Sequence, residues 1–378
     1  MFWKNLVYKW LFTVIISITV IVFITCIVDP VNIIGSPIIN GFNHFKVKEG
    51  DFLDINKLYQ YHDIKPDVVF IGSSRIYVGI DPKIKKNSFN FGQSGLSIKN
   101  LKNYINFIVK VHKPRKVYIG LDFFQFDKAN YNFNNNNFEQ KRLDYICKFK
   151  DTPLMKILKI YDSIPFVKYV PVTINESIYN VNTGNLFYYG ADYYRGKNSI
   201  ISQEGFYGFL NHFVNLYKNW EYEEKTLEDL SYIILLLNRN NIETKIFFNP
   251  ISADLYNALY LSNKIDDFNK IKMELTKLTE FYDFSYINDF TSNRNYFYDS
   301  SHYNMKAGEI VIDCIDGTMN SEIFYRCNKN NIIYVINKEM LDYEKWKEDN
   351  FQYYRLTYEN IINNKYFKKG DLRNFWGF

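Results

Sequence analysis

The sequence is poor in the residues that interrupt regular structure. Its 378 residues include 17 Gly and 9 Pro, against 33 Tyr and 33 Phe. Chains that stay disordered have few aromatic side chains and many structure-breaking ones. The composition therefore excludes a largely disordered chain and predicts one or two packed domains with a sizeable core.

Cysteine is scarce as well, and no block of one charge is present. The four cysteines lack the spacing of a metal site, and Cys26 lies inside a long apolar stretch. We therefore expect no metal, no cofactor and at most one disulfide among Cys147, Cys314 and Cys327. The net charge of +5 is spread along the chain, which argues against a nucleic-acid partner.

One long uncharged run stands near the N-terminus. Leu11 to Val28 is 18 residues long and as a helix reaches about 27 Å, roughly a bilayer core. Lys4 and Lys9 precede it, which predicts a cytoplasmic N-terminus and an extracytoplasmic chain after Asp29. A cleaved signal peptide is the alternative, but the long apolar core and the missing A-x-A-like site favour an uncleaved anchor in the cell membrane.

Apolar runs alternate with helical patterns from residue 67 onward. Strands are predicted at Asp67–Ile71, Ser88–Phe91, Lys116–Leu121, Thr244–Phe248 and, more weakly, Tyr282–Ile287. Helices are predicted at Leu96–Val111, Thr226–Leu237, Asp266–Phe281 and Asn304–Met319. Continuous apolar strands between helices predict an α/β fold with a mainly parallel five-stranded sheet, covered on both faces.

This order of elements divides the chain into four parts. Residues 1–29 form the anchor and residues 30–65 a connector without sustained periodicity. Residues 66–319 form the main domain, with an Asn-rich insertion at about 127–205. Residues 320–378 are a C-terminal appendage, with a possible strand at Ile332–Ile336.

Right-handed crossovers place the turn after each parallel strand at one edge of the sheet. Ser74 follows the first strand, and the motif Asp299-Ser300-Ser301-His302 follows the last. Residues about 225 positions apart thus become neighbours at this edge. A serine, an imidazole and an acid supply the nucleophile, base and orienting group of serine acyl chemistry.

Three motifs resemble those of SGNH (GDSL-like) hydrolases and acyltransferases. Gly72-Ser73-Ser74 stands where the family has Gly-Asp-Ser, Asn90 to Gly95 matches Asn-x-Gly-x-x-Gly, and Asp299 to His302 matches Asp-x-x-His. The resemblance covers roughly residues 67–127 and 242–315, and it implies a flavodoxin-like three-layer sandwich. It also implies that Ser74 is the nucleophile, that His302 and Asp299 complete a triad, and that Gly95 and Ser74 give backbone N–H groups to the oxyanion.

The family's third motif is where the chain departs. Gly-x-Asn-Asp is replaced by Gly120-Leu121-Asp122-Phe123, and an ionised carboxylate cannot donate to an oxyanion. Either burial keeps Asp122 protonated, or Asp122 has another part and a different donor completes the oxyanion hole. Arg75 either binds an anionic group of the substrate or pairs with a carboxylate. Asn249 either lines the site or caps a loop.

Among SGNH proteins, the chain is most similar to a membrane-anchored cell-envelope branch, which includes the D-alanyl-lipoteichoic acid protein DltD and the alginate O-acetylation proteins. That resemblance implies an extracytoplasmic O-acyltransferase or esterase with a polysaccharide or teichoic-acid-like acceptor and a membrane-bound O-acyltransferase partner. One alternative is a non-catalytic accessory domain that binds polymer or that partner. Another is a secreted esterase of broad specificity.

Overall fold

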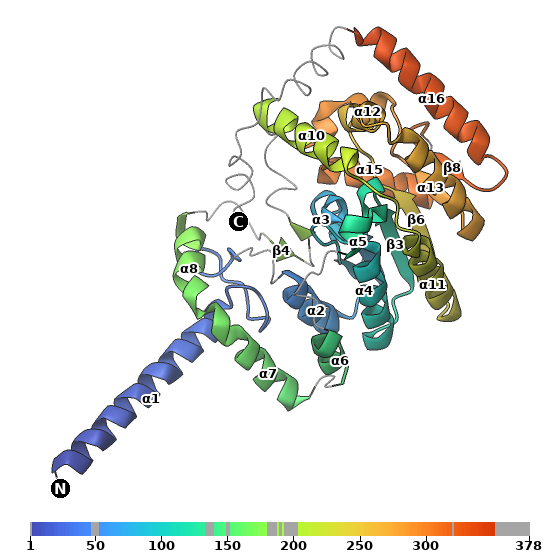
Figure 1. Cartoon of the computed structure of the whole chain (residues 1–378). Coiled ribbons are helices and arrows are strands. Elements are labelled where there is room, and N and C mark those ends of the chain that lie inside the picture. The colour runs from blue at the N-terminus through green and yellow to red at the C-terminus, as the bar shows by residue number, and fades with distance from the viewer. Residues whose placement is uncertain are drawn as a thin grey trace. The chain divides into compact units, whose positions relative to one another are not determined.

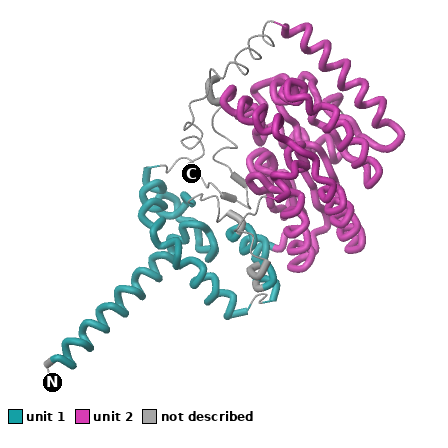
Figure 2. The backbone as a smooth tube through the Cα atoms, in the orientation of Figure 1, with its two compact units in different colours: residues 1–64, 139–188 teal, residues 65–138, 189–378 magenta. Residues whose placement is uncertain are grey.

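The computed structural model describes residues 2–46, 53–132, 140–148, 152–179, 187–188, 191–192, 203–319 and 321–351. The chain divides into two compact units (Figure 2). Unit 1 comprises residues 1–64 and 139–188, and unit 2 comprises residues 65–138 and 189–378. Each unit therefore draws on two separate segments of the chain.

Unit 1 is mostly helical and begins with the apolar helix (Figure 1). Its elements are α1 (Phe2–Val28), α2 (Leu53–Ile64), α6 (Gln140–Lys148), α7 (Pro153–Ser163), the 3-10 helix η3 (Ile164–Tyr169), α8 (Val170–Tyr179) and the short strand β4 (Phe187–Tyr188). From Trp3 to Val28, α1 is long and apolar enough to cross a membrane. It starts before the predicted apolar run and includes Lys4 and Lys9.

Helix α2 lies within the stretch predicted to be an irregular connector. Its side chains are buried on several sides, from Ile55 through Tyr59 to His62. A helix with buried residues on several sides lacks the one-sided apolar stripe that marks a surface helix in a sequence. The missing periodic pattern in this stretch therefore does not exclude a helix.

Unit 2 is a mixed α/β unit built on a six-stranded, mostly parallel sheet. The strand order is β2-β1-β3-β6-β7-β8, and only β8 runs antiparallel to its neighbour. The strands are β1 (Val68–Gly72), β2 (Ser88–Asn90), β3 (Lys116–Leu121), β6 (Glu243–Phe248), β7 (Phe281–Asp283) and β8 (Tyr325–Cys327). A further short strand, β5, spans Ala191–Asp192.

The expectation of five strands was one short. The sixth strand, β8, comes from the stretch predicted to be an appendage, and it pairs with β7 at the edge of the sheet. Three residues are too few to show strand alternation in a sequence. The predicted strand at Ile332–Ile336 is wrong, because these residues begin the helix α16 (Ile332–Asp349), whose buried positions Val335, Glu339 and Tyr343 recur every four residues.

Helices occupy the connections between the strands. They are α3 (Ser74–Gly79), α4 (Ile98–Val111), α5 (Lys128–Asn132), α10 (Gln203–Lys218), α11 (Lys225–Arg239), α12 (Ala253–Leu261), α13 (Ile265–Leu278), α14 (Asp289–Ser292) and α15 (Met305–Asp316), with 3-10 turns η1 (Pro82–Ile84), η2 (Phe123–Phe126) and η4 (Arg294–Tyr296). Local signals set several boundaries. The Ser97 side chain accepts from Asn100 N–H to begin α4, and Gly317 ends α15 in a left-handed conformation.

The main core cluster joins the sheet to two of its helices. Phe70, Tyr118 and Phe247, from three neighbouring strands, pack with Ile76 of α3 and Val311 of α15. All five side chains are fully buried, and each such burial stabilises the fold by about 1.5–3 kcal/mol. This packing holds α3, which begins with Ser74, and α15, which follows His302, against the same sheet.

A buried ion cluster fixes α16 to the sheet. Lys272 Nζ of α13 lies 2.7 Å from Asp283 Oδ2 and 2.7 Å from Glu339 Oε2. Burial raises the pKa of Glu339 to about 8, although the Lys272 ammonium opposes this shift. The cluster links α13, the last residue of β7 and α16, so the residues of α16 belong to the packed unit.

Candidate active site

Ser74, His302 and Asp299 meet at the edge where the strands end. Ser74 Oγ lies 2.8 Å from His302 Nε2, and His302 Nδ1 lies 2.8 Å from Asp299 Oδ2. Asp299 and His302 are buried, whereas Ser74 is only partly buried. The serine is therefore the most accessible member of this hydrogen-bonded chain.

The surroundings of Asp299 determine which imidazole nitrogen carries the proton. Asp299 Oδ1 accepts the backbone N–H groups of Ser301 and His302, at 2.7 and 2.8 Å. Burial by itself would raise the pKa of Asp299, but the His302 side chain and these hydrogen bonds outweigh it and lower that pKa. An ionised Asp299 accepts only, so His302 Nδ1 donates to it and Nε2 is left to accept the Ser74 hydroxyl proton.

A glycine pair brings the Ser74 turn close to the neighbouring strand. Gly72 of β1 stands in register with Gly120 of β3, and a Cβ at Gly72 would lie 2.5 Å from the Gly120 carbonyl oxygen. The next residue, Ser73, caps α3 by accepting the Arg75 N–H at 3.2 Å. The capping role open to a serine in this turn thus falls to Ser73, and the Ser74 hydroxyl is left to face His302.

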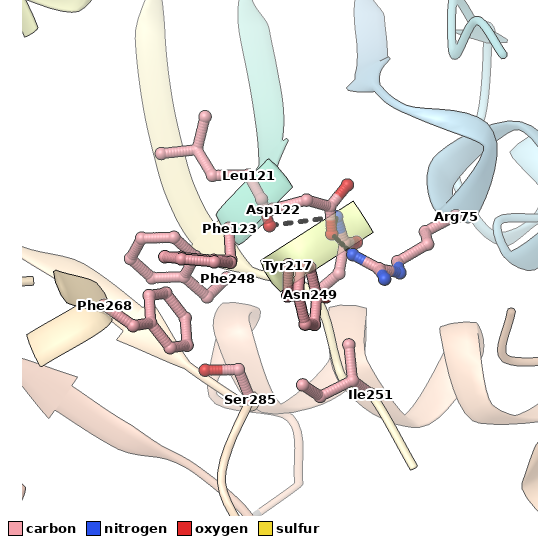
Figure 3. A pocket seen from close by; sticks show the side chains of 10 residues that line it. All are labelled: Arg75, Leu121, Asp122, Phe123, Tyr217, Phe248, Asn249, Ile251, Phe268 and Ser285. Atoms are coloured by element: carbon pink, nitrogen blue, oxygen red, sulfur yellow. Dashed lines mark hydrogen bonds and ion pairs between the residues drawn. The ribbon is translucent and has the colours of Figure 1, made fainter. Parts of the chain in front are cut away.

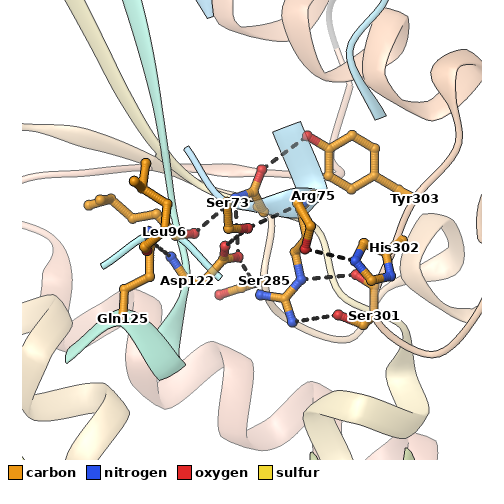
Figure 4. Close-up of polar contacts among 12 residues, drawn as sticks. Ser73, Arg75, Leu96, Asp122, Gln125, Ser285, Ser301, His302 and Tyr303 are labelled. Atoms are coloured by element: carbon orange, nitrogen blue, oxygen red, sulfur yellow. Dashed lines mark hydrogen bonds and ion pairs between the residues drawn. The ribbon is translucent and has the colours of Figure 1, made fainter. Parts of the chain in front are cut away.

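Asp122 forms part of a buried ion pair. Its carboxylate forms an ion pair with Arg75 and accepts a hydrogen bond from Ser73 Oγ (Figure 4). It also accepts a hydrogen bond from Asn249 Nδ2 at 3.1 Å. Both side chains of the ion pair are buried. The Arg75 cation therefore compensates the buried Asp122 carboxylate, and Asp122 is an acceptor within this network.

Arg75 connects the turn after β1 to the turn that carries His302. Besides its ion pair, it donates from Nε to Ser301 O at 2.9 Å and from Nη2 to Ser301 Oγ at 3.0 Å (Figure 4). Burial acts to lower the pKa of Arg75, but Asp122 raises it overall. Of the two alternatives for Arg75, the structure has the ion pair, and this pair holds Ser301 next to His302.

Asn249 connects the end of a third strand, β6, to the hydrogen bonds around Asp122. Its Nδ2 donates to Leu121 O at 3.2 Å as well as to Asp122, and its Oδ1 accepts the Tyr303 hydroxyl at 3.0 Å. Tyr303 follows His302 directly. Asn249 thus links β6 to the turns after β3 and before α15, rather than capping its own loop.

Arg75 and Asn249 line a small cavity together with Asp122, Tyr217 and Ser285 (Figure 3). Its volume is about 10 Å³, which is room for roughly one water molecule. An acyl chain or a sugar does not fit there. This cavity therefore gives Arg75 and Asn249 no room for the substrate contact that was one of the two alternatives for each.

The Asn90–Gly95 motif holds the Ser74 turn from the side of β2. Asn90 Nδ2 donates to Ile76 O and Ile80 O, each at 2.8 Å, and Gln93 N–H donates to Gly72 O at 2.9 Å. Gly95 is exposed, with φ +62°, and a Cβ added there would meet no atom within 4 Å. The glycine is thus required by its left-handed backbone rather than by close approach, and its oxyanion role stays a prediction.

Some residues around the site have no counterpart among the sequence predictions. Phe209 of α10 meets the His302 ring edge to face at 6.2 Å, the Phe213 ring lies 5.6 Å from the Arg75 guanidinium carbon, and Tyr217 hydrogen-bonds Arg75. These three residues are spaced four apart, which is a helical stripe readable in the sequence. The stripe begins just after the predicted insertion, where no helix was expected.

Comparison with known proteins adds little to this geometry. No family model and no curated protein matches the chain. Among solved structures, the crystal structure of a "putative acylhydrolase" from Bacteroides fragilis aligns with a TM-score of 0.35 and 12% identity, covering 72% of this chain and 100% of that one. A TM-score this low does not establish a shared fold. Among the described residues, no group of three or more His, Cys, Asp or Glu is placed to hold a metal.

Proposed function

We propose that the chain is a membrane-anchored, extracytoplasmic serine O-acyltransferase or esterase of the SGNH type, with a flavodoxin-like three-layer unit. One observation carries the proposal: Ser74 Oγ, the His302 imidazole and Asp299 form a continuous chain of hydrogen bonds, each 2.8 Å long. These are the contacts that turn a serine hydroxyl into a nucleophile.

In the proposed mechanism, Ser74 Oγ attacks the carbonyl carbon of an ester while His302 Nε2 takes the hydroxyl proton. His302 then gives this proton to the leaving alcohol, and the acyl group remains on Ser74 as an ester. An incoming sugar hydroxyl or water next loses its proton to His302 and attacks the acyl-serine. The proton returns to Ser74, and the free enzyme is restored. Throughout, ionised Asp299 stabilises the imidazolium form of His302.

Backbone N–H groups of Ser74 and Gly95 are the proposed donors to the oxyanion. Asp122 is not proposed as a third donor, because its carboxylate is engaged by Arg75, Ser73 and Asn249. The loss of one oxyanion donor typically slows an enzyme by about 10²–10³-fold. We therefore propose acyl transfer to a specific acceptor ahead of rapid general ester hydrolysis.

The proposed location and acceptor rest on α1 and on the resemblance of the motifs to cell-envelope proteins. With Lys4 and Lys9 in the cytoplasm, α1 would leave the remainder of the chain outside the cell. A cell-wall or exported polysaccharide, including a teichoic-acid-like polymer, is then the proposed acceptor. A membrane-bound O-acyltransferase is the proposed partner that supplies the acyl group.

The test uses the full chain in detergent with a fluorophosphonate probe and a short activated ester. Wild type should form a covalent probe adduct on Ser74 and release the alcohol of the ester. Ser74→Ala should lose both, while Ser292→Ala, at an exposed serine at the end of α14, should keep both. Equal probe labelling of wild type and Ser74→Ala would remove the basis for the proposal.

The runner-up is a non-catalytic accessory domain that binds polymer or the membrane partner. The observation in its favour is the Asp122–Arg75 ion pair, which leaves the position of the family's asparagine without a donor. This alternative predicts polymer binding that is the same in wild type and Ser74→Ala, with no probe adduct in either protein. Probe labelling of wild type that depends on Ser74 decides against it.

A further inference from the structure

Helix α7 of unit 1 has its polarity reversed relative to a helix on the surface of a water-soluble protein. Its buried residues are Met155, Lys159 and Ser163, spaced four apart, whereas Ile157 and Tyr161 are exposed. Lys159 is buried because it pairs with Asp63 and lies over the Tyr59 ring. In water, the apolar side chains of such a helix would be expected to face inward instead.

Helix α8 also buries polar side chains, although η3 between the two helices buries Phe166. Thr173 and Ser177 of α8 are fully buried, and Ser177 Oγ accepts the Phe45 N–H at 2.9 Å. The exposed apolar residues of the three elements are Leu154, Ile157, Ile160, Tyr161, Ile164, Val167, Val172, Ile178 and Tyr179. We call these nine residues the apolar band. Apolar side chains outside, with polar ones such as Lys159 and Ser177 paired inside, are the arrangement that a lipid environment favours.

The apolar band adjoins the end of α1. Helices α7, η3 and α8 all contact α1, and Ser163 hydrogen-bonds Cys26 in its last turn. Figure 1 shows α7 and α8 extending to either side of this end of α1, across the direction of the helix. The band therefore begins at the level where α1 would leave a bilayer.

The junction after α1 is built as a fixed structure. Asn43 Nδ2 donates to Ile27 O at 3.0 Å, and Lys46 Nζ donates to Val28 O at 3.0 Å and to Asp29 O at 2.8 Å. These bonds satisfy carbonyls that a helix end leaves unpaired, and they place a cation at the negative end of the helix dipole. The same segment is joined to α8 through the Phe45 N–H, which donates to Ser177 Oγ, so the end of α1 and α8 are linked.

The charges around the band suit an anionic lipid surface. The exposed charged side chains of α7, η3 and α8 are Lys156 and Lys168, and Glu176 of α8 is partly exposed. The one aspartate of these elements, Asp162, is only partly exposed and accepts a hydrogen bond from Tyr59 OH. Lysines beside exposed apolar residues are the composition of segments that lie in a membrane interface.

We propose that the apolar band is a membrane-docking surface, which lies in the headgroup and upper acyl region of the same bilayer that α1 crosses and contacts anionic phospholipid. The proposal rests on the membrane span proposed above and is independent of acyl chemistry at Ser74. Its consequence is that unit 1 holds the chain at the bilayer surface through two attachments, α1 and the band.

The test places a photo-crosslinking residue, p-benzoylphenylalanine, at one position at a time in the full chain. The protein is reconstituted in vesicles of phosphatidylcholine and phosphatidylglycerol, illuminated, and analysed for lipid adducts by mass spectrometry. Ile157 and Ile178 are the test positions, Ile18 in α1 is the positive control, and Leu235 in α11 of unit 2 is the negative control. The four side chains are similarly exposed, at 61%, 55%, 56% and 51%, so differences in yield report the surroundings.

We expect lipid adducts at Ile157 and Ile178 to exceed those at Leu235 by about tenfold and to approach those at Ile18. Adducts at Ile18 with only the Leu235 level at both test positions would overturn the docking surface and leave the membrane span in place. Absence of adducts at Ile18 would overturn both. In native membranes, protein adducts in place of lipid adducts at the test positions would also overturn it.

A second variant tests the lipid charge without changing the packed side of the helices. Lys156→Glu/Lys168→Glu should lower the adduct yield at Ile157 by about threefold in vesicles with phosphatidylglycerol, and leave it unchanged in pure phosphatidylcholine. An equal yield from the variant and its parent in the anionic vesicles would overturn the preference for anionic lipid.

Discussion

Asp122→Asn removes one charge from the buried ion pair and leaves the other in place. Arg75 would keep its guanidinium inside the protein, where it is 1% exposed, without a carboxylate to balance it. The remaining acceptors, Ser301 O, Ser301 Oγ and the Tyr217 hydroxyl, are neutral. The substitution is close to isosteric, so the lost charge accounts for most of its effect.

The expected magnitude follows from the burial of the pair. Removing one partner of a buried ion pair lowers the free energy of unfolding by about 3–5 kcal/mol. That is a large part of the roughly 5–15 kcal/mol that stabilises a typical domain. At about 2–4 °C per kcal/mol for a unit of this size, Tm should fall by roughly 6–20 °C.

Thermal and urea unfolding of the full chain in detergent would measure this loss. Glu280→Gln is the matched control, because it breaks an exposed ion pair with Arg326 and should lower stability by less than about 1 kcal/mol. Asp122→Asn/Arg75→Gln should recover much of the stability, since no charge is left buried. If Asp122→Asn unfolds like wild type, or if the double variant is no more stable than the single one, the reasoning is refuted.

Three further predictions concern other parts of unit 2. The folded-state pKa of Asp299 is lowered, so its contribution to stability is present above its unfolded pKa of about 4 and is lost as the pH falls through the lower folded value. The difference in unfolding free energy between wild type and Asp299→Asn should therefore shrink below about pH 4. A difference that does not depend on pH would contradict this. Gly95→Ala should lower stability by about 1–2 kcal/mol, because the φ of +62° at this position strains an alanine. The control is Gly208→Ala in helix α10, where the added methyl group has open space, and it should be neutral or stabilising in the same thermal melts. Lys272→Met removes the cation between the buried side chains of Asp283 and Glu339 and should lower stability by about 3–5 kcal/mol. Lys338→Ala, on the exposed face of α16, should leave Tm unchanged. Similar melting of Lys272→Met and wild type would argue against the buried cluster.

The parts of the fold that the sequence predicted are those with a strong local signal. Runs such as Val117 to Leu121 are apolar throughout because both faces of the strand are buried, and the sequence shows this directly. Strand β8 and helix α2 gave no such signal. β8 is too short for periodicity, and α2 is buried on several sides, so its residues show no amphipathic pattern.

The candidate site divides in the same way. Ser74, Asp299 and His302 were recognisable because each lies in a short motif at a predicted strand end. Phe209 and Tyr217 belong to α10, whose position against the site depends on packing between elements that are distant in the sequence. Residue types and spacing alone do not specify such a contact.

Ser74, His302 and Asp299, their order along the chain, and the apolar span before them were determined by the sequence alone. The part played by Asp122 was decided only by the tertiary structure. Its carboxylate pairs with a guanidinium 47 residues away, and the sheet brings the two together by gathering the ends of β1 and β3 at one edge. Whether a carboxylate is repelled or stabilised depends on which charge lies beside it once water is excluded, and folding determines that neighbour.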